Sequence, residues 1–370
     1  MNRREFFLYS VGTGLAACAG MRLHRGEKYA QAKADQRKGE GSAMNSRWIR
    51  PGAEEKRPIW GLRDGIQVGL WPASLEGEGD GGPRGLLRIG YPILDGGKRI
   101  GLLNFIAIEP SVNGRRGFSE LERSTSDGKP GIQFWTGPAD KPTDVPDPGT
   151  LRAVDGVETL SVTVRTERFG NGARPIVALE IRADRPGELR LTVTSAPGSA
   201  PMETCVLTAT MGNYARLRRL WLRDEVVEAK KVWPDFDGNE FTEDAFFAQE
   251  RLVRTPDGDL IVCATSDEAD PHAVPPDPAG PGWAYRGSFP VTQYWRKPAE
   301  GCKSSGFKVR VNGRKVYWAT HNPIPGGIAY ENFDLVEPFC EGQVFVFGIT
   351  RRSPEEVARA DRLTHAIPRP

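Results

Sequence analysis

The chain has 370 residues, of which 38% are hydrophobic and 26% are charged, and its formal net charge is +2. This balance gives no reason to expect nucleic acid or an anionic surface as a partner. The length is sufficient for one large domain or two ordinary ones. After the first residues no uncharged apolar run reaches the roughly 20 residues that a membrane-spanning helix needs.

The N-terminus has the features of an export signal. Arg3-Arg4 is followed by Phe6-Phe7, a short apolar run and the sequence Leu15-Ala16-Ala17-Cys18. A charged start, an apolar stretch and small residues before a cleavage point predict an export signal over residues 1–17. The arginine pair resembles a twin-arginine signal, and Leu-Ala-Ala-Cys resembles the lipobox of bacterial lipoproteins. The resemblance implies a protein of the periplasm or cell surface with a lipid anchor on Cys18. The alternative is an ordinary cleaved signal with a chance cysteine.

The rest of the chain divides by composition into a tether and a large domain. Residues 18–56 are polar and charged with no steady hydrophobic period, which predicts a flexible tether. From residue 57 to residue 370, Gly and Pro turn signals recur at intervals of roughly 8–12 residues, as they do in all-β proteins. The expected strands are Gly85–Tyr91, Leu102–Ile108, Thr159–Thr166, Ile176–Arg182, Glu188–Thr194, Leu260–Thr265, Phe307–Val311, Lys315–Ala319 and Val344–Ile349. We therefore predict an all-β domain, a large antiparallel β-sandwich or two packed sandwiches, with a few short helices.

Local signals predict one hairpin and up to three helices. Asn312-Gly313 is typical of a two-residue hairpin turn. Ser353 followed by Glu356 fits a capping box at the start of a short helix. Thr242–Arg251 is predicted as a second short helix, and Asn213–Glu228 is either a helix or a strand.

Cysteines and possible cation ligands allow a few alternatives. Cys205, Cys263, Cys302 and Cys340 form either two disulfides or buried thiols in an exported protein. The chain has four histidines and no Cys-x-x-Cys spacing, so no zinc site is expected. The oxygen-rich segment from Trp233 to Glu240 is either a plain turn or a calcium loop, and we expect no other cofactor.

The first candidate site follows a predicted strand that begins near Asn104. That strand brings Glu109 to its end, where Pro110 is expected to stop the ladder. The loop after it supplies charged residues, namely Arg115, Arg116, Glu120 and Glu122. Two carboxylates beside arginines would suit the acid and base of glycoside cleavage, whereas the alternative is a surface cluster of ion pairs.

The second candidate site surrounds one loop near the C-terminus. His321 precedes Asn322 and a Pro-Gly-Gly turn, and Glu331 and Asn332 follow. His321 would serve as a general base near neutral pH, and Glu331 as an acid, base or nucleophile. The alternative is a hairpin tip whose polar side chains make turn hydrogen bonds.

The third candidate is an aromatic surface for sugar stacking. It consists of Trp135, Trp283, Tyr294 and Trp295, with arginines nearby. The alternative is that these aromatic residues belong to the core.

Together these features favour an exported protein that cleaves polysaccharide. Hydrolysis would use a pair chosen from the carboxylates Glu109, Glu120, Glu122 and Glu331. β-Elimination from a uronic acid would instead use His321 or a tyrosine as base, with Asn104 and Arg115 or Arg116 neutralising the substrate carboxylate. Motifs for nucleotide hydrolysis, dinucleotide binding and serine hydrolases are missing from the sequence. The alternative is a carbohydrate-binding or structural envelope lipoprotein without catalysis.

Overall fold

The computed structural model describes residues 47–52, 57–70, 84–94, 97, 99–143, 145–210, 212, 215–267, 291–300, 306–317 and 321–359. Residues from Trp48 onward form one compact unit. The predicted export signal, Cys18 as the predicted lipid-anchor site, and most of the predicted tether lie outside the described residues.

Two large antiparallel sheets make up this unit. Sheet I contains β1 (Trp48–Ile49), β2 (Ile59–Leu62), β3 (Gln67–Leu70), β4 (Leu86–Leu94), β5 (Arg99–Val112), β6 (Arg115–Arg116), β12 (Thr204–Ala209), β15 (Ala245–Ala248), β19 (Lys308–Arg314) and β20 (Ala329–Val336). Sheet II contains β7 (Phe134–Thr136), β8 (Thr150–Val154), β9 (Val157–Thr166), β10 (Pro175–Arg182), β11 (Glu188–Ser195), β13 (Leu217–Trp221), β14 (Val226–Glu228), β16 (Val253–Arg254), β17 (Leu260–Ser266), β18 (Thr292–Lys297) and β21 (Gln343–Thr350). The described helices are α2 (Ala229–Val232), α3 (Pro354–Arg359) and the 3-10 turn η3 (Gln249–Arg251).

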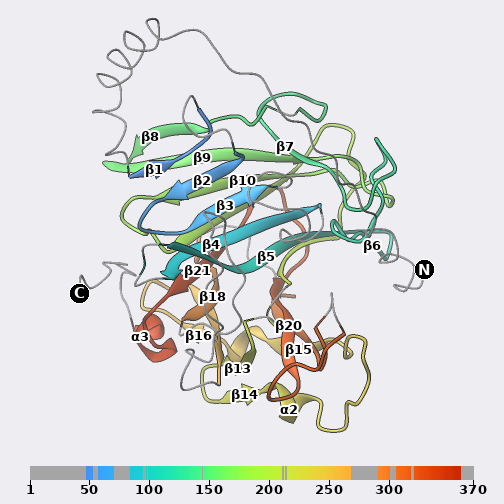
Figure 1. The fold of residues 1–370 in the computed structure, drawn as a ribbon, viewed down its shortest axis with the longest axis vertical. Coiled ribbons are helices and arrows are strands. Elements are labelled where there is room, and N and C mark those ends of the chain that lie inside the picture. Colours follow the sequence, from blue (N-terminus) through green and yellow to red (C-terminus); the bar gives the residue numbers. More distant parts are fainter. Residues whose placement is uncertain are drawn as a thin grey trace, which may run out of the picture. The chain divides into compact units, whose positions relative to one another are not determined.

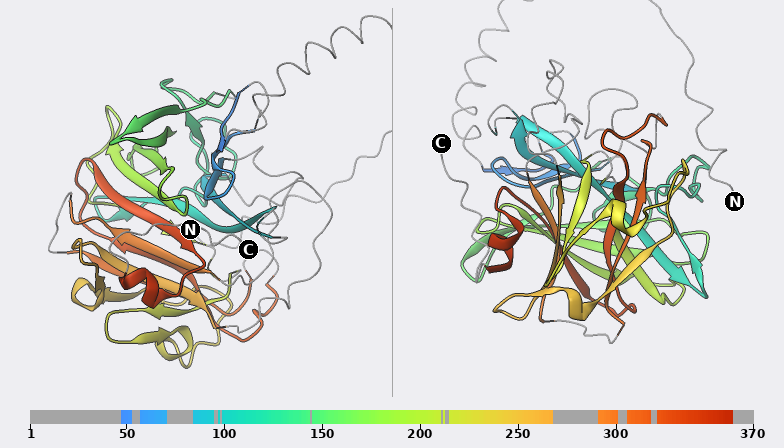
Figure 2. Two further views of the ribbon diagram at one scale, coloured as in Figure 1. Left: turned by 90° about the vertical axis from the view of Figure 1, so that its left-hand side faces the viewer. Right: turned by 90° about the horizontal axis from the view of Figure 1, so that it is seen from below.

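The order of strands brings distant parts of the chain together. Sheet I runs β1-β2-β3-β4-β5-β12-β20-β19-β15, and sheet II runs β14-β13-β17-β18-β21-β11-β10-β9-β7. In Figure 1 the blue and cyan strands β2 to β5 lie across the green strands β9 and β10, and Figure 2 shows the same strands from two further sides. The all-β sandwich prediction is therefore confirmed, and the described strands form a single pair of sheets.

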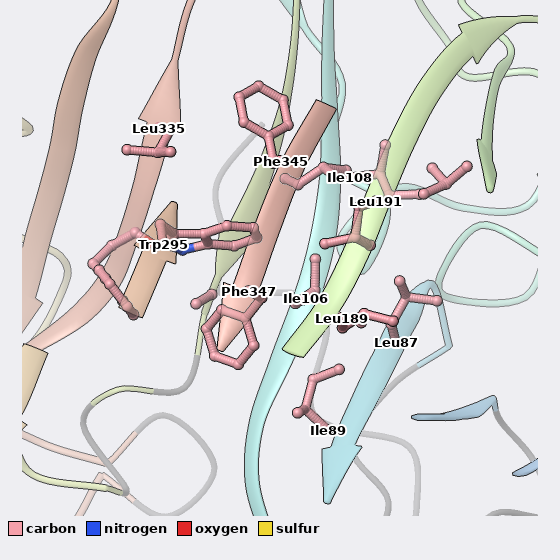
Figure 3. Close-up of a cluster of buried hydrophobic side chains, with 14 of the residues drawn as sticks. Leu87, Ile89, Ile106, Ile108, Leu189, Leu191, Trp295, Leu335, Phe345 and Phe347 are labelled. Atoms are coloured by element: carbon pink, nitrogen blue, oxygen red, sulfur yellow. The ribbon is translucent and has the colours of Figure 1, made fainter. Parts of the chain in front are cut away.

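The core lies between the two sheets. Ile106 and Ile108 of β5 share one hydrophobic cluster with Leu189 and Leu191 of β11, and Figure 3 shows these side chains close together. Trp295 of β18 packs against Phe345 and Phe347 of β21. Its indole Nε1 donates to the Phe333 carbonyl of β20 at 2.9 Å, which links sheet II to sheet I.

Alternation along the strands determines which side chains face away from this core. In β11, Leu189, Leu191 and Val193 face inward, so Glu188 and Arg190 lie on the opposite face. The same rule places Tyr294 and Arg296 on the outer face of sheet II, because Trp295 faces inward. In sheet I it places Glu109 on β5, Arg310 on β19 and Asp334 on β20 on the outer face, because their neighbours join the core.

The local predictions meet mixed outcomes. The helix α3 begins where its capping box predicts, with the Glu356 backbone N–H donating to Ser353 Oγ at 3.3 Å and the Ser353 N–H donating to Glu356 Oε2 at 2.7 Å. The predicted helix over Thr242–Arg251 is wrong, because strand β15 pairs with β19 there and only η3 is helical. Residues within Asn213–Glu228 form strands β13 and β14.

The predicted hairpin turn at Asn312-Gly313 and the predicted end of a strand at Pro110 are also wrong. Asn312-Gly313 lies inside β19, where Asn312 pairs with Asn332 and Gly313 with Tyr330, so Glu331 of β20 is the extra residue of a bulge. Strand β5 continues past Pro110 to Val112, with Pro110 opposite Cys205 of β12. Proline lacks an N–H, but the Pro110 carbonyl still accepts from Gly117 N at 2.7 Å, so pairing continues beyond it.

Candidate functional site

An arginine held between two carboxylates lies on the outer face of sheet I. Arg310 Nη2 donates to Glu109 Oε2 at 2.8 Å and to Asp334 Oδ2 at 2.7 Å. Arg310 Nε donates to Asp334 Oδ1 at 3.1 Å, so the second contact is bidentate. The three side chains are 4%, 3% and 0% exposed. We call Arg310, Glu109 and Asp334 the Arg310 network.

The rim of the Arg310 network closes it from solvent. Arg116 Nη2 donates to Glu109 Oε2 at 2.7 Å, and Arg116 Nη1 reaches Asp244 at 3.4 Å. Burial would raise the pKa of Glu109, but Arg310 and Arg116 outweigh burial and hold that pKa below its ordinary value. Burial raises the pKa of Asp334 despite its pairing with Arg310. A substrate would have to displace Arg116 before it could reach either carboxylate.

A second arginine between two carboxylates lies on the outer face of sheet II. Arg296 donates to Glu188 in bidentate fashion, from Nε to Oε1 at 3.2 Å and from Nη2 to Oε2 at 2.5 Å. Arg296 Nη1 donates to Asp259 Oδ2 at 2.6 Å. Asp259 Oδ1 accepts from the Ala299 backbone N–H at 2.8 Å, which fixes its orientation. We call Arg296, Glu188 and Asp259 the Arg296 network.

Tyr294 is buried beneath the Arg296 network and holds Glu188 by a hydrogen bond. Its hydroxyl donates to Glu188 Oε1 at 3.0 Å. Burial, reinforced by the negative charge of Glu188, raises the pKa of Tyr294 well above its ordinary value, so the hydroxyl keeps its proton. The ring lies against the backbone of β21 at Gly348, where a Cβ atom would be only 1.9 Å from Tyr294 Cζ. Glycine at this position therefore makes room for the tyrosine that holds Glu188.

A surface cavity of about 370 Å³ opens directly over the Arg296 network. Glu188, Asp259 and Arg296 all line it, and the other charged side chains around it are Glu180, Arg182, Arg185, Arg190, Asp257 and Glu300. Glu188 Oε2 and Asp259 Oδ2 bind neighbouring nitrogens of one guanidinium at 2.5 and 2.6 Å, so they lie no more than about 7–8 Å apart. Paired carboxyl groups that cleave glycosidic bonds are separated by roughly 5–9.5 Å. The upper limit for Glu188 and Asp259 falls within this range, and both carboxyl groups line an opening to solvent.

The acidic residues predicted on the loop after β5 are separated by the structure. Glu109 belongs to the Arg310 network. Glu122 is half-buried and holds the loop together, because Oε1 accepts from Phe118 N at 3.1 Å and Oε2 from Gly170 N at 2.8 Å. Glu120 is 8% exposed and Arg115 is exposed on β6. The catalytic roles suggested for these residues remain predictions.

The residues of the predicted C-terminal site also occupy different environments. His321 is exposed on a turn with φ of 56°, and its backbone N–H donates to the Tyr317 carbonyl at 2.8 Å. Glu331 is 2% exposed and falls at the register shift of β20. The neighbouring Asn332 is paired in register with Asn312, and no hydrogen-bond partner of its buried Oδ1 atom is found among the described residues.

Burial of the aromatic residues limits which of them could touch a sugar. Trp295 and Tyr294 are fully buried, so neither exposes a ring face to a ligand. Trp135 is 3% exposed but lines a second cavity, at the edge of the sandwich. Trp283 lies outside the described residues. Asn104 faces sheet II across the core, where its Nδ2 donates to Gln293 Oε1 at 2.7 Å.

Sequence reasoning missed the polar partners that face each other across strands. Glu188 begins the predicted strand Glu188–Thr194, and Arg296 is one of the arginines beside the predicted aromatic surface. The signal was present in the alternation, because Glu188 and Arg296 occupy outward positions beside inward Leu189 and Trp295. Their meeting depends on β18 and β11 both pairing with β21, which the sequence pattern does not specify.

The described cysteines combine both predicted alternatives. Cys205 and Cys263 are free thiols, and burial raises the pKa of each. Cys340 is disulfide-bonded, and Cys302 lies outside the described residues. Within the described ranges, no three His, Cys, Asp or Glu side chains are grouped in a way that could hold a metal ion.

No protein-family model matches this chain, and no curated protein matches it. Among the described helices, none has the length and apolar composition needed to cross a bilayer.

Proposed function

We propose that this chain is an exported, lipid-anchored protein that cleaves polysaccharide by hydrolysis at the Arg296 network. One observation carries the proposal: Glu188 and Asp259 flank a single arginine on the floor of an open cavity of about 370 Å³. Glu188 and Asp259 are 5% and 12% exposed, and both line this cavity. The N-terminal resemblance to twin-arginine lipoproteins supports export and anchoring through Cys18.

The two carboxyl groups differ in their hydrogen bonds, which supports different roles. Glu188 accepts from Tyr294, from Arg296 twice and from Arg185 at 3.4 Å, and these donors stabilise its ionised form. We assign Glu188 as the base that takes a proton from the attacking water. Among the described residues, Asp259 accepts from only two donors, Arg296 and the Ala299 N–H, and both favour its ionised form, so it would first take up a proton from solvent in the cavity. It would then donate that proton to the leaving oxygen as the glycosidic C–O bond breaks and the water oxygen bonds to the anomeric carbon.

The positions of the other residues support hydrolysis over β-elimination. Elimination needs a cationic group for the substrate carboxylate beside a base, and neither of the two described cavities is lined by His321 together with Arg115 or Arg116. Arg116 is already engaged by Glu109 and Asp244, and Asn104 faces the core. His321 lies on an exposed turn.

A non-catalytic carbohydrate-binding role is the second candidate, and one observation favours it. Four donors already satisfy Glu188, as in a network that only holds strands together. Under this alternative the cavity would bind sugar hydroxyls through its charged rim without proton transfer.

An activity screen separates the two candidates. The protein would be incubated with neutral and uronic-acid polysaccharides, and both new reducing ends and the ultraviolet absorbance of unsaturated products would be followed. We expect reducing ends without absorbance. Glu188→Gln and Asp259→Asn should each lower kcat by at least about 10²–10³-fold, the typical contribution of a positioned acid or base. Azide should partly restore activity to Glu188→Ala, which a purely structural glutamate would not allow.

Glu109→Gln is the matched control, because Glu109 is an equally buried, arginine-paired carboxylate outside the cavity. It should lower stability but leave kcat of the folded protein unchanged. Glu331→Gln and His321→Ala would be measured beside it. If no substrate is cleaved but one is bound, the carbohydrate-binding role remains. If unsaturated products absorb in the ultraviolet and this absorbance is lost in His321→Ala, the reaction is elimination.

Export and anchoring are tested separately. Replacing Arg3 and Arg4 by lysine should retain the precursor inside the cell if the signal is of the twin-arginine type. Cys18→Ala should release the exported protein from the membrane fraction, as judged by cell fractionation. A protein that stays soluble outside the cell with Cys18 intact would contradict the lipid anchor.

A further inference from the structure

The second cavity, of about 450 Å³, lies at the edge of the sandwich and plays no part in the proposed hydrolysis. It is formed where β2, β3 and β4 begin or end and where β7 pairs with β9. Its apolar walls come from Pro58, Trp60, Phe134, Trp135, Pro142 and Pro146. A cavity with aromatic walls and a few polar groups is typical of a small-ligand site.

The aromatic walls are fixed before any ligand arrives. Trp60 Nε1 donates to the Asp147 carbonyl at 2.9 Å, and Trp135 Nε1 donates to the Ala139 carbonyl at 2.7 Å. Both indole N–H groups are already used, and the two rings are only 0% and 3% exposed, so they form the base of the cavity beneath Phe134 and the prolines. Phe134 is half-buried. Rigid walls of this kind reduce the entropy that binding must overcome.

The polar side of the cavity carries one unmatched positive charge. Asp127 accepts from Arg84 Nη1 at 2.9 Å, from Gln133 Nε2 at 2.9 Å and from the Lys129 backbone N–H at 3.0 Å. Desolvation would raise the pKa of Asp127, but hydrogen bonds with the Lys129 N–H, Ser124 and Arg84, and the charge of Arg84, outweigh it and hold the pKa well below its ordinary value. The Asp127 charge therefore cancels that of Arg84. The ammonium of Lys129 forms no ion pair within the described part of the chain.

We propose that this cavity binds a uronic-acid unit, with the sugar ring against Phe134 and the proline walls and its carboxylate at Lys129. Sugar C–H groups are attracted to the negative faces of aromatic rings. A carboxylate on the same ring supplies the negative partner for the Lys129 ammonium. Such a charge-assisted contact is stronger than a neutral one. A neutral sugar would fill the same walls but leave the ammonium without an acidic partner. The proposal is independent of hydrolysis, because the Arg296 network lines the other cavity.

Binding is measured on the full-length protein with trigalacturonate, through tryptophan fluorescence and calorimetry. The matched ligand is its methyl ester, which has the same rings without charge, and benzoate provides a ring carboxylate without sugar. We expect trigalacturonate to bind at least about tenfold more tightly than its ester, in line with one hydrogen-bonded charge pair. Raising the salt concentration should weaken binding of the acid but not of the ester.

Three variants locate the site. Lys129→Gln should weaken binding of trigalacturonate about tenfold and leave the ester unchanged. Lys231→Gln is the control, because Lys231 is an exposed lysine far from the cavity lining. Glu188→Gln should bind normally, which separates this site from the hydrolytic cavity even if no activity is found. The proposal is overturned if the ester or benzoate binds as tightly as the acid, if Lys129→Gln has no effect, or if Glu188→Gln abolishes binding.

Discussion

Each sheet carries a buried arginine between two carboxylates on its outer face, but the two networks meet solvent differently. In the Arg310 network all three side chains are at most 4% exposed, and Arg116 covers the approach. In the Arg296 network the three side chains are 5–12% exposed and line an open cavity. The same arrangement of charges is thus closed in one sheet and open in the other.

This difference in access to solvent predicts that one network acts only on stability, whereas the other can also act on a ligand. A buried ion pair adds little net stability over an apolar replacement, but the loss of one partner leaves a costly buried charge. A closed network therefore acts mainly through the fold. A network at the floor of a cavity has the same internal contacts, and in addition its carboxylates are within reach of a ligand. The comparison predicts that variants of the Arg310 network act on stability, whereas variants of the Arg296 network act on function.

The largest expected effect is that of removing Arg310. Arg310→Met leaves Glu109 and Asp334 buried without their shared cation and should lower the free energy of unfolding by about 3–5 kcal/mol. Arg296→Met should cost less, about 1–3 kcal/mol, because water in the cavity can solvate the released carboxylates. Denaturant unfolding of both variants at neutral pH measures the difference. Equal losses would show that the cavity gives Glu188 and Asp259 no access to water.

Gly348→Ala tests the support of the open network without changing any charged residue. The added Cβ atom would lie 1.9 Å from Tyr294 Cζ, so the ring must move away from Glu188. We expect a loss of about 1–3 kcal/mol in the free energy of unfolding, as in other overpacked sites, with a lower kcat. Gly52→Ala is the control, because nothing lies within 4 Å of its added Cβ atom. An unchanged kcat in folded Gly348→Ala would show that Tyr294 does not position Glu188.

Much of the fold could be read from the sequence because strand alternation is a local signal. The pattern of Leu189, Leu191 and Val193 predicts β11 directly, and the Ser353 cap predicts the start of α3. The errors arose where tertiary pairing overrode a local preference. Thr242–Arg251 has a plausible helix cap, but its apolar residues pair as β15 with β19.

The candidate site was less predictable because its members come from distant strands. Glu188 and Arg296 are separated by 108 positions, and Arg310 and Glu109 by 201. Polar residues that lie close together in the sequence, such as those around His321, are easier to notice than Glu188 and Arg296. Their side chains nevertheless lie in different environments, because His321 is exposed and Glu331 is buried. Only the order of strands in each sheet shows which outward-facing charges become neighbours.

The pH dependence of stability distinguishes the two carboxylates of the closed network. The pKa of Glu109 is held below its ordinary 4.5, so its contribution to stability is present above that value and is lost as pH falls through the folded-state pKa. The pKa of Asp334 is raised above its ordinary 3.8, so its contribution is present below that value and is lost as pH rises through the folded-state pKa.

Removing Asp334 and removing Glu109 should therefore change the slope of the free energy of unfolding against pH in opposite directions. Between about pH 3 and 6, the free energy of unfolding of Asp334→Asn should rise with pH more steeply than that of the unsubstituted protein, and that of Glu109→Gln less steeply. Each displaced pKa unit corresponds to about 1.4 kcal/mol. Denaturant unfolding across this range measures both slopes. Parallel profiles would show that the two carboxylates do not titrate separately.

The smallest expected effect concerns the rim of the closed network. Asp244 is 25% exposed, contacts Arg116 at 3.4 Å and accepts from Asn312 Nδ2 at 3.1 Å. Because solvent screens this ion pair, Asp244→Asn should change the free energy of unfolding by no more than about 1 kcal/mol. A loss above about 2 kcal/mol, closer to that of a buried pair, would mean that Asp244 is part of the buried unit. Arg116 would then be fixed from both sides, and Glu109 would be as closed to ligands as Asp334.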